Sequence, residues 1–230
     1  MTIRGEEFGA RFADATFESF EKTPGNDAAL EAAIELVDRG TQGRGLIIQG
    51  KEGLGKSHLL VAIAKAFDAR YSFHAEAETS TRSVRVPDLH KLIQEARGSE
   101  DIDTDGPTLS GDEIDRDASV VYWTMPVLIQ RLRADAANYT TTTADQCQAC
   151  DLLLIDDLGL GQQVTPFIVG EIERIIDHRY RHLKPIGVTS NKALADAVIE
   201  VFGSRIYSRL AEMCEIVDVV GEDYRLKAAR

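Results

Sequence analysis

The segment GKEGLGKS, residues 50–57, constrains the fold of this 230-residue chain more than any other feature. It matches the pattern G-x-x-x-x-G-K-S and lies between a short apolar run, 45–49, and a stretch with apolar residues at helical spacing, 56–68. Glycines let the backbone turn tightly, so that successive N–H groups and the following helix N-terminus face a phosphate. The segment therefore predicts a loop that binds the phosphates of a nucleotide.

The same pattern predicts a role for each residue of this phosphate loop. Lys56 is expected to reach the β- and γ-phosphates of ATP, and the Ser57 hydroxyl is expected to ligate Mg²⁺. Further contacts with the nucleotide are expected from Gly50, Glu52, Gly53, Leu54, Gly55 and His58.

A second motif is the run DLLLIDD, residues 151–157, in which a continuous apolar strand ends in two carboxylates. Open α/β sheets bind ligands at the carboxyl ends of their strands. Asp156 is therefore expected to hold Mg²⁺, directly or through water, and Asp157 to orient or activate the attacking water. Asn191, which follows the apolar run 186–189, is the expected third polar group near the γ-phosphate.

Apolar runs and helical patterns alternate along the chain, although the pattern weakens over residues 75–119, and this alternation predicts an α/β layered fold with a parallel sheet. Strands are expected at 45–49, 120–123, 151–155, 186–189 and 215–220. Helices are expected at 26–39, 56–68, 86–97, 125–137, 166–182, 193–202 and 205–213.

Charge and composition limit the class of protein. The net charge of −12 excludes a uniformly basic surface for nucleic acid. The window 99–117 holds eight acidic residues and one basic residue, and we expect it to be a solvated surface element within an insertion at about 75–119. No apolar run is long enough for a membrane span, and the three cysteines are an odd count typical of a reducing cytoplasm.

The segments LLLIDDLG, IIDHRYRHLKPIGVTSN, SRIYSRL and GEDYRLK, in this order, resemble the DnaC/IstB group of AAA+ ATPases. That group holds bacterial and phage helicase loaders and transposition helper ATPases. The lead-in segment TFESFEKTPGNDAALEAA is similar as well, so the resemblance covers residues 15–74 and 120–227.

The resemblance implies one AAA+ domain over residues 1–230, with a lead-in segment at 1–25. It implies a three-layer α/β/α P-loop NTPase core with parallel strand order 5-1-4-3-2, here without a carboxy-terminal helical lid. It also implies ATP hydrolysis, self-assembly through ATP at subunit interfaces, contact with single-stranded or duplex DNA, and a protein client.

Arg209 lies where the family carries its arginine finger, with Arg205 one helical turn away as the alternative. A surface arginine with no such role remains a further alternative. The expected function is that of a loader for a replicative helicase. A transposition helper with a transposase as client, and a nucleotide switch that does not hydrolyse ATP, are the alternatives.

Three weaker signals remain open. Cys147 and Cys150 form a CxxC and, with His178 and His182, make a candidate metal site; buried thiols beside surface histidines are the favoured alternative. Phe17 and Phe20 are candidates to pack on adenine or in the core. Candidates for DNA contact, each equally explained by a solvated helix face, are Arg131, Arg133, Arg174, Arg179, Arg181 and Lys184.

Overall fold

The computed structural model describes residues 3–71, 119–159 and 164–224. The predicted helix at 86–97 and residues 75–118 of the predicted insertion lie outside this part of the chain. The strands are β1 (Ile3–Gly5), β2 (Gly45–Gln49), β3 (Val120–Thr124), β4 (Leu152–Asp156), β5 (Ile186–Ser190) and β6 (Cys214–Asp218). The α-helices are α1 (Asp27–Arg39), α2 (Lys56–Tyr71), α4 (Met125–Ala137), α5 (Thr142–Ala149), α6 (Pro166–Arg181), α7 (Leu194–Phe202) and α8 (Ser204–Met213).

The strands form one parallel sheet in the order β1-β3-β4-β5-β2-β6. Numbered from the phosphate-loop strand β2, the five predicted strands stand in the order 5-1-4-3-2, which confirms the expected fold. The sixth strand, β1, adds a short edge beside β3 and was not predicted. Its three residues, one of them glycine, are too few to show a strand pattern.

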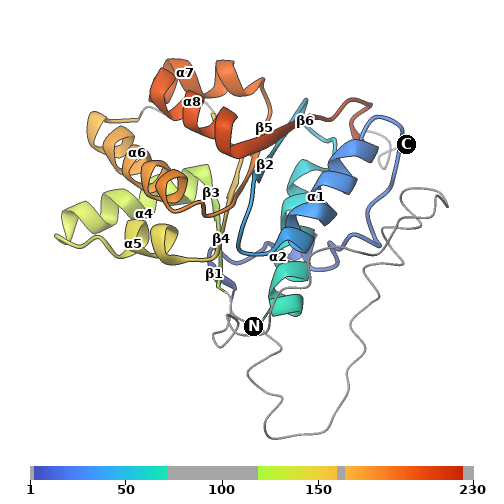
Figure 1. Cartoon of the computed structure of the whole chain (residues 1–230), viewed down its shortest axis with the longest axis horizontal. Helices are drawn as coiled ribbons and strands as arrows, with labels where there is room; N and C mark the ends of the chain where they lie inside the picture. The colour runs from blue at the N-terminus through green and yellow to red at the C-terminus, as the bar shows by residue number, and fades with distance from the viewer. Residues whose placement is uncertain (1–2, 72–118, 160–163, 225–230) are drawn as a thin grey trace, which may run out of the picture.

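The sheet lies between two helical layers, as Figure 1 shows, with α1 and α2 on one face and α4 to α8 on the other. Alternate strand residues divide between the two faces. In β4, for example, Leu152 and Leu154 belong to the core under α1 and α2, whereas Leu153 and Ile155 belong to the opposite core. Each face of the sheet therefore has its own apolar core, as expected for continuous apolar strands in a parallel sheet.

Local chemistry explains two element boundaries. Strand β4 begins one residue later than predicted because the Asp151 carboxylate accepts a 2.8 Å hydrogen bond from the Ser119 backbone N–H. Helix α6 begins at Pro166, and the Thr165 hydroxyl caps it by accepting a hydrogen bond from the Ile168 N–H at 3.4 Å.

Helix α5 was not predicted from the sequence, because its eight residues bury only Thr143, Ala144 and Cys147 and so show little apolar pattern.

The prediction of Arg179 as a candidate for DNA contact is wrong. Its guanidinium is buried and cannot reach a DNA phosphate. It donates to the carbonyls of Cys147, Cys150, Asp151 and Pro185 at 2.6–3.1 Å. Burial lowers the pKa of this guanidinium from its ordinary value. Arg179 therefore joins α6 to the chain that enters β4, a structural role that its position on a basic helix end did not reveal.

No helix in the three described ranges combines the length and the apolar character that a membrane span requires.

Candidate active site

The phosphate loop joins β2 to α2 at the carboxyl edge of the sheet. Lys56 is 5% exposed, and its ammonium group donates to the Lys51 carbonyl at 2.6 Å, so the side chain lies along the loop. Gly53 has a φ of +73°, and a Cβ there would collide with the Asp223 carboxylate. The Tyr224 N–H donates to the Gly53 carbonyl at 3.0 Å. The loop conformation thus needs glycine, and the segment after β6 closes against it.

The Asp156 carboxylate lies beside this loop and is 3% exposed. Its Oδ1 accepts hydrogen bonds from the Ser57 hydroxyl at 3.1 Å and from the Thr189 hydroxyl. Its Oδ2 accepts a 3.1 Å hydrogen bond from the Tyr122 hydroxyl. Burial and the adjacent Asp156 raise the pKa of Tyr122, so that its hydroxyl stays protonated and donates. The structure therefore brings together Ser57 and Asp156, the two predicted metal ligands.

Asp157 and Asn191 also meet, as the sequence predicted. The Asn191 side-chain amide donates to Asp157 Oδ1 at 3.1 Å, and the Asp157 N–H donates to the Thr189 hydroxyl at 2.9 Å. Asp157 has a φ of +61°, a left-handed conformation that aspartate adopts more readily than most residues. This turn directs the Asp157 side chain out of the strand and toward Asn191.

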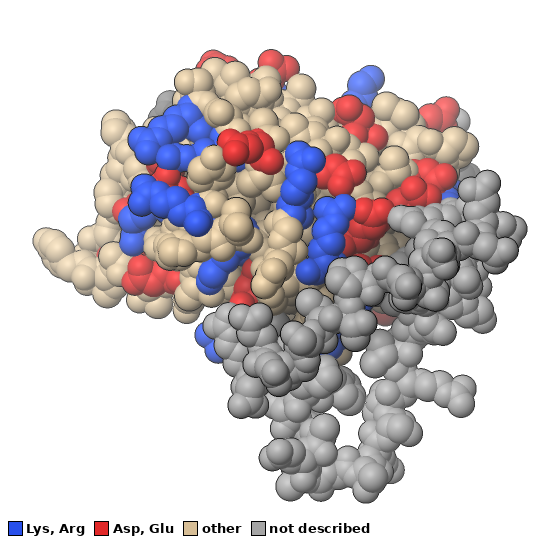
Figure 2. Space-filling view, in the orientation of Figure 1, with Lys and Arg blue, Asp and Glu red and all other residues tan. Residues whose placement is uncertain are grey.

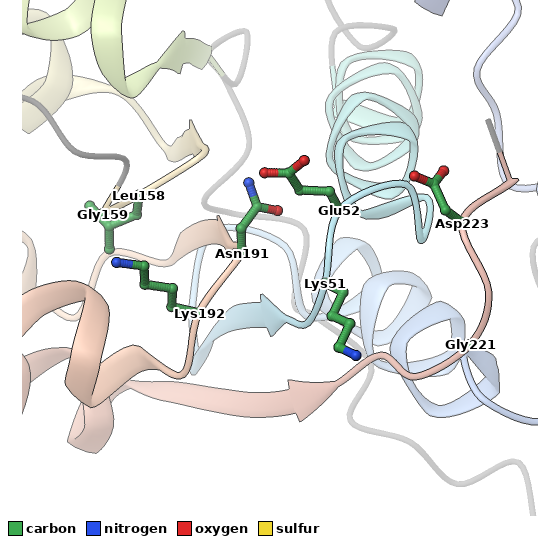
Figure 3. Close-up of a pocket in the computed structure, with 8 residues that line it drawn as sticks. All are labelled: Lys51, Glu52, Leu158, Gly159, Asn191, Lys192, Gly221 and Asp223. Atoms are coloured by element: carbon green, nitrogen blue, oxygen red, sulfur yellow. The ribbon is translucent and has the colours of Figure 1, made fainter. Parts of the chain in front are cut away.

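A pocket of about 450 Å³ lies over the phosphate loop. Its wall includes Lys56, Ser57, Asp157 and Asn191, with Phe20 from the lead-in segment. A second pocket, of about 470 Å³, adjoins it and shares Glu52 and Asn191 with the first. Figure 3 shows the Glu52 and Asn191 side chains pointing toward each other in this second pocket. Glu52 and Asn191 thus line both pockets.

The lead-in segment is held over the loop by His58. The His58 Nε2 atom lies 2.8 Å from the Thr16 carbonyl oxygen and 3.3 Å from the Ser19 hydroxyl. Phe20 packs edge-on against the His58 ring, with centroids 5.4 Å apart, and lines the first pocket. Phe17 is 7% exposed and belongs to the core under α1 and α2. Of the two aromatic candidates for adenine, Phe20 is the one that lines the pocket.

The donor set at Ser57 and Asp156 fits Mg²⁺, which prefers hard oxygen ligands. The Ser57 hydroxyl and an Asp156 carboxylate oxygen lie 3.1 Å apart at the edge of the phosphate loop. The buried carboxylate is surrounded by hydroxyl groups, so a cation there would meet a negative charge with little water around it. These two residues could hold the metal ion.

Arg209 lies on α8, and its side chain contacts residues of α6 in the same chain. Its guanidinium forms an ion pair with Asp177 on α6 and lies 5.7 Å from the Tyr180 ring centroid, and its side chain is 16% exposed. Arg205 pairs with Glu173 at 2.9 Å and is 65% exposed. In Figure 2, basic side chains gather at the left of the view, where Figure 1 places α6 and α8, with acidic side chains between them.

The other basic residues predicted as candidates for DNA contact differ in their exposure and in their partners within the chain. Arg131 and Arg133 on α4 are exposed, and the 67% exposed Arg181 forms an ion pair with Asp177. Arg174 donates to Glu171 at 2.8 Å, and Lys184 donates to the Ala149 carbonyl at 2.6 Å.

The four candidate metal ligands Cys147, Cys150, His178 and His182 form no common cluster. Cys147 and Cys150 are buried, and the Arg179 guanidinium donates to the Cys150 sulfur at 3.3 Å. The His178 and His182 rings lie 4.3 Å apart on the end of α6. Within the described residues, no group of three or more His, Cys, Asp or Glu side chains has an arrangement that could hold a metal ion.

Sequence reasoning missed two residues of the site, Tyr122 and Thr189. Tyr122 lies in β3 and Thr189 lies in β5, and the hydroxyl group of each donates a hydrogen bond to the Asp156 carboxylate. The signal that could have found them is a hydroxyl side chain near the carboxyl end of an otherwise apolar strand. Its use depends on knowing which strands are neighbours, which only the sheet order supplies.

Comparison with known proteins identifies related families. The sequence model of the family described as IstB-like ATP binding protein matches residues 108–230. The model of the bacterial DnaA ATPase domain matches residues 12–77. No curated protein sequence matches the chain.

Solved structures share the fold. The DnaC helicase loader is 21% identical with a TM-score of 0.64, over 92% of this chain and 100% of that one. DnaI is 17% identical with a TM-score of 0.62, over 96% of each chain. AMPPCP-bound DnaA from Aquifex aeolicus is 19% identical with a TM-score of 0.63, over 94% of this chain and 53% of that one.

Proposed function

Because the chain belongs to the family of IstB-like ATP-binding proteins, we propose that it binds ATP with Mg²⁺ and hydrolyses the bond to the γ-phosphate. One observation carries the proposal. The Asp156 carboxylate meets the Ser57 hydroxyl at the phosphate loop, and the Asp157–Asn191 pair follows at the same edge of the sheet. A nucleotide-binding loop alone would need the first of these pairs but not the second.

In this proposal Lys56 leaves the Lys51 carbonyl and donates to the β- and γ-phosphates. Ser57 and Asp156 would hold Mg²⁺, which would supply positive charge to neutralise the phosphate oxygens. Asp157 accepts a hydrogen bond from the attacking water and orients it toward the γ-phosphorus. Asn191 holds the Asp157 carboxylate in place and offers its own polar group to the same region.

A phosphate-release assay with and without DNA tests the enzyme activity. The wild-type protein should release phosphate from ATP in the presence of Mg²⁺, and Lys56→Ala should not. Tight binding of ATP without any release by the wild-type protein would instead support the alternative of a nucleotide switch that does not hydrolyse ATP.

For the cellular role we propose a loader of a replicative helicase that contacts DNA and assembles through ATP at subunit interfaces. The fold is shared with a structure described as a helicase loader, and with a DnaA structure described as bound to single-stranded DNA. In this proposal Arg209 acts on the ATP of a neighbouring subunit. A head-to-tail contact of that kind builds rings or open helices.

The role of a transposition helper remains the second candidate, and the IstB-like family match favours it. Co-purification from the native host separates the two roles, because a hexameric helicase and a transposase are easily distinguished. Recovery of a transposase without a helicase would reject the loader proposal.

A further inference from the structure

We propose that Tyr122 is a positioning residue for Mg²⁺ binding, because its hydroxyl fixes the orientation of the Asp156 carboxylate. The inference rests on the proposed function, since it concerns the complex of this protein with Mg²⁺ and ATP. Nothing in the phosphate-loop pattern or in the acidic motif that ends β4 points to this residue, which comes from a different strand.

Sheet topology places Tyr122 next to Asp156. Tyr122 is paired with Leu154 in the register of β3 and β4, and residues two apart in a strand share a face. The Tyr122 and Asp156 side chains are therefore diagonal neighbours on the face covered by α1 and α2. A long aromatic side chain spans that diagonal, so the hydroxyl reaches Asp156 Oδ2 at 3.1 Å.

Packing fixes the Tyr122 ring. The residue is 3% exposed, and the Phe8 ring packs edge-on against it with centroids 4.9 Å apart. Beyond the ring, the Glu6 carboxylate accepts from the Thr124 N–H and hydroxyl at 2.9 and 2.7 Å, which ties the lead-in segment to the end of β3. The Tyr122 hydroxyl therefore has a defined position from which to donate.

The two oxygens of the Asp156 carboxylate have different partners. Tyr122 donates to Oδ2, whereas Ser57 and Thr189 donate to Oδ1. Rotation of the carboxylate about its last bond would break hydrogen bonds on both oxygens, so the Tyr122 bond keeps Oδ1 turned toward Ser57. Partners of this kind behind a metal ligand typically change metal affinity 10- to 100-fold when they are removed.

The test is Tyr122→Phe, which keeps the ring and removes only the hydroxyl. Mg²⁺ is titrated into the protein with a fluorescent ATP analogue that cannot be hydrolysed, and binding is followed by anisotropy. The variant should need about 10-fold more Mg²⁺ for half-maximal binding. Its affinity for the analogue in EDTA should equal that of the wild-type protein, because the phosphate loop is unchanged.

Tyr71→Phe is the matched control. The Tyr71 hydroxyl donates to the Val37 carbonyl at 3.1 Å in a buried position at the other end of α2 from Ser57. Its loss removes a buried hydrogen bond of the same kind and should leave the Mg²⁺ midpoint unchanged. Circular dichroism and the melting temperature without Mg²⁺ report whether each variant is folded. The rise in melting temperature on adding Mg²⁺ and analogue provides a second readout.

Three results would overturn the proposal. One is a Tyr122→Phe midpoint equal to that of the wild-type protein. Another is an equal shift in both variants, which would indicate general loosening of the fold. A wild-type protein that binds no analogue at any Mg²⁺ concentration would overturn the proposed function and this inference with it, so the two failures are distinguishable.

Discussion

The side-chain amide of Asn191 donates a 3.1 Å hydrogen bond to the Asp157 carboxylate, joining the ends of two neighbouring strands. Asp157 reaches this position through a left-handed turn directly after β4, and its N–H is held by the Thr189 hydroxyl. These hydrogen bonds define the geometry of the pair at the carboxyl edge of the sheet. The proposed role of Asp157 in orienting water requires such an arrangement, since disorder in it would add to the barrier of the reaction.

Lys56→Ala should weaken ATP binding about 10- to 100-fold while the fold remains intact. A charge-assisted hydrogen bond contributes about 1.5–3 kcal/mol, and Lys56 is the cation that we propose to donate to the β- and γ-phosphates. Isothermal titration calorimetry measures the affinity, and Lys51→Ala, in the same loop, is the comparison. Unchanged affinity in a folded Lys56→Ala protein would contradict the phosphate-loop assignment.

Asp157→Asn should keep ATP bound and slow hydrolysis about 10²- to 10⁴-fold, the range typical of a lost general base. Asp156 and Ser57 remain in this variant, so the Mg²⁺ site is retained. Asp196→Asn removes an exposed carboxylate in the first turn of α7 and serves as the control. If Asp157→Asn hydrolyses ATP at the wild-type rate, another group activates the water.

Arg209→Ala should leave the ATP affinity of the monomer nearly unchanged and lose both hydrolysis and ATP-driven assembly. An arginine finger contributes about 10³-fold or more to hydrolysis. Mixing this variant with Lys56→Ala should restore some activity, because one composite site then has an intact loop and an intact finger. Phosphate release and analytical ultracentrifugation measure the two effects.

Because Arg209 forms an ion pair with Asp177, Arg209→Ala could also lower the stability of the fold, and a second variant is needed to compare melting temperatures. Arg205→Ala removes the more exposed neighbour on the same helix, whose side chain is 65% exposed against 16% for Arg209. A mixture that remains inactive although both proteins are folded and associate would reject the trans role of Arg209. Arg205 would then be the next candidate.

Arg179→Met should lower the free energy of unfolding by about 3 kcal/mol or more, because buried carbonyls that lose their donor each cost about 1–3 kcal/mol. Arg181→Met, on the same helix and 67% exposed, should change it by less than about 0.5 kcal/mol. Urea unfolding measures both values. Equal effects of the two substitutions would show that the carbonyls around Arg179 find other partners.

The three cysteine thiols should resist alkylation in the folded protein at pH 8 and react once it is unfolded. All three are free and buried, and burial raises the pKa of Cys147 to about 12. The unfolded thiol ionises near pH 9, so this raised pKa makes stability fall as the pH rises from about 9 toward 12. Mass spectrometry after iodoacetamide treatment counts the modified thiols. Rapid labelling of Cys147 without denaturant would contradict its buried position.

The sequence by itself determined the order of strands β2 to β6 and of the described α-helices other than α5. It also determined the phosphate loop and the acidic end of β4. These are local patterns: the spacing of glycines in a loop, apolar runs of strand length, and polar residues where a strand stops. The five predicted strands appear in the structure with shifts of a few residues or less at their ends. The proposed metal ligands Ser57 and Asp156, and the pair Asp157 and Asn191, could be predicted for the same reason.

Only the tertiary structure decided which other side chains meet these residues. Tyr122 reaches Asp156 because β3 lies beside β4, and Phe8 and Glu6 lie near it because β1 joins the edge of the sheet. Arg179 looks in the sequence like a member of a basic helix end, yet the packing of α6 against α5 buries it. Contacts between segments far apart in the chain depend on how the layers pack, and no local spacing of residues encodes that packing.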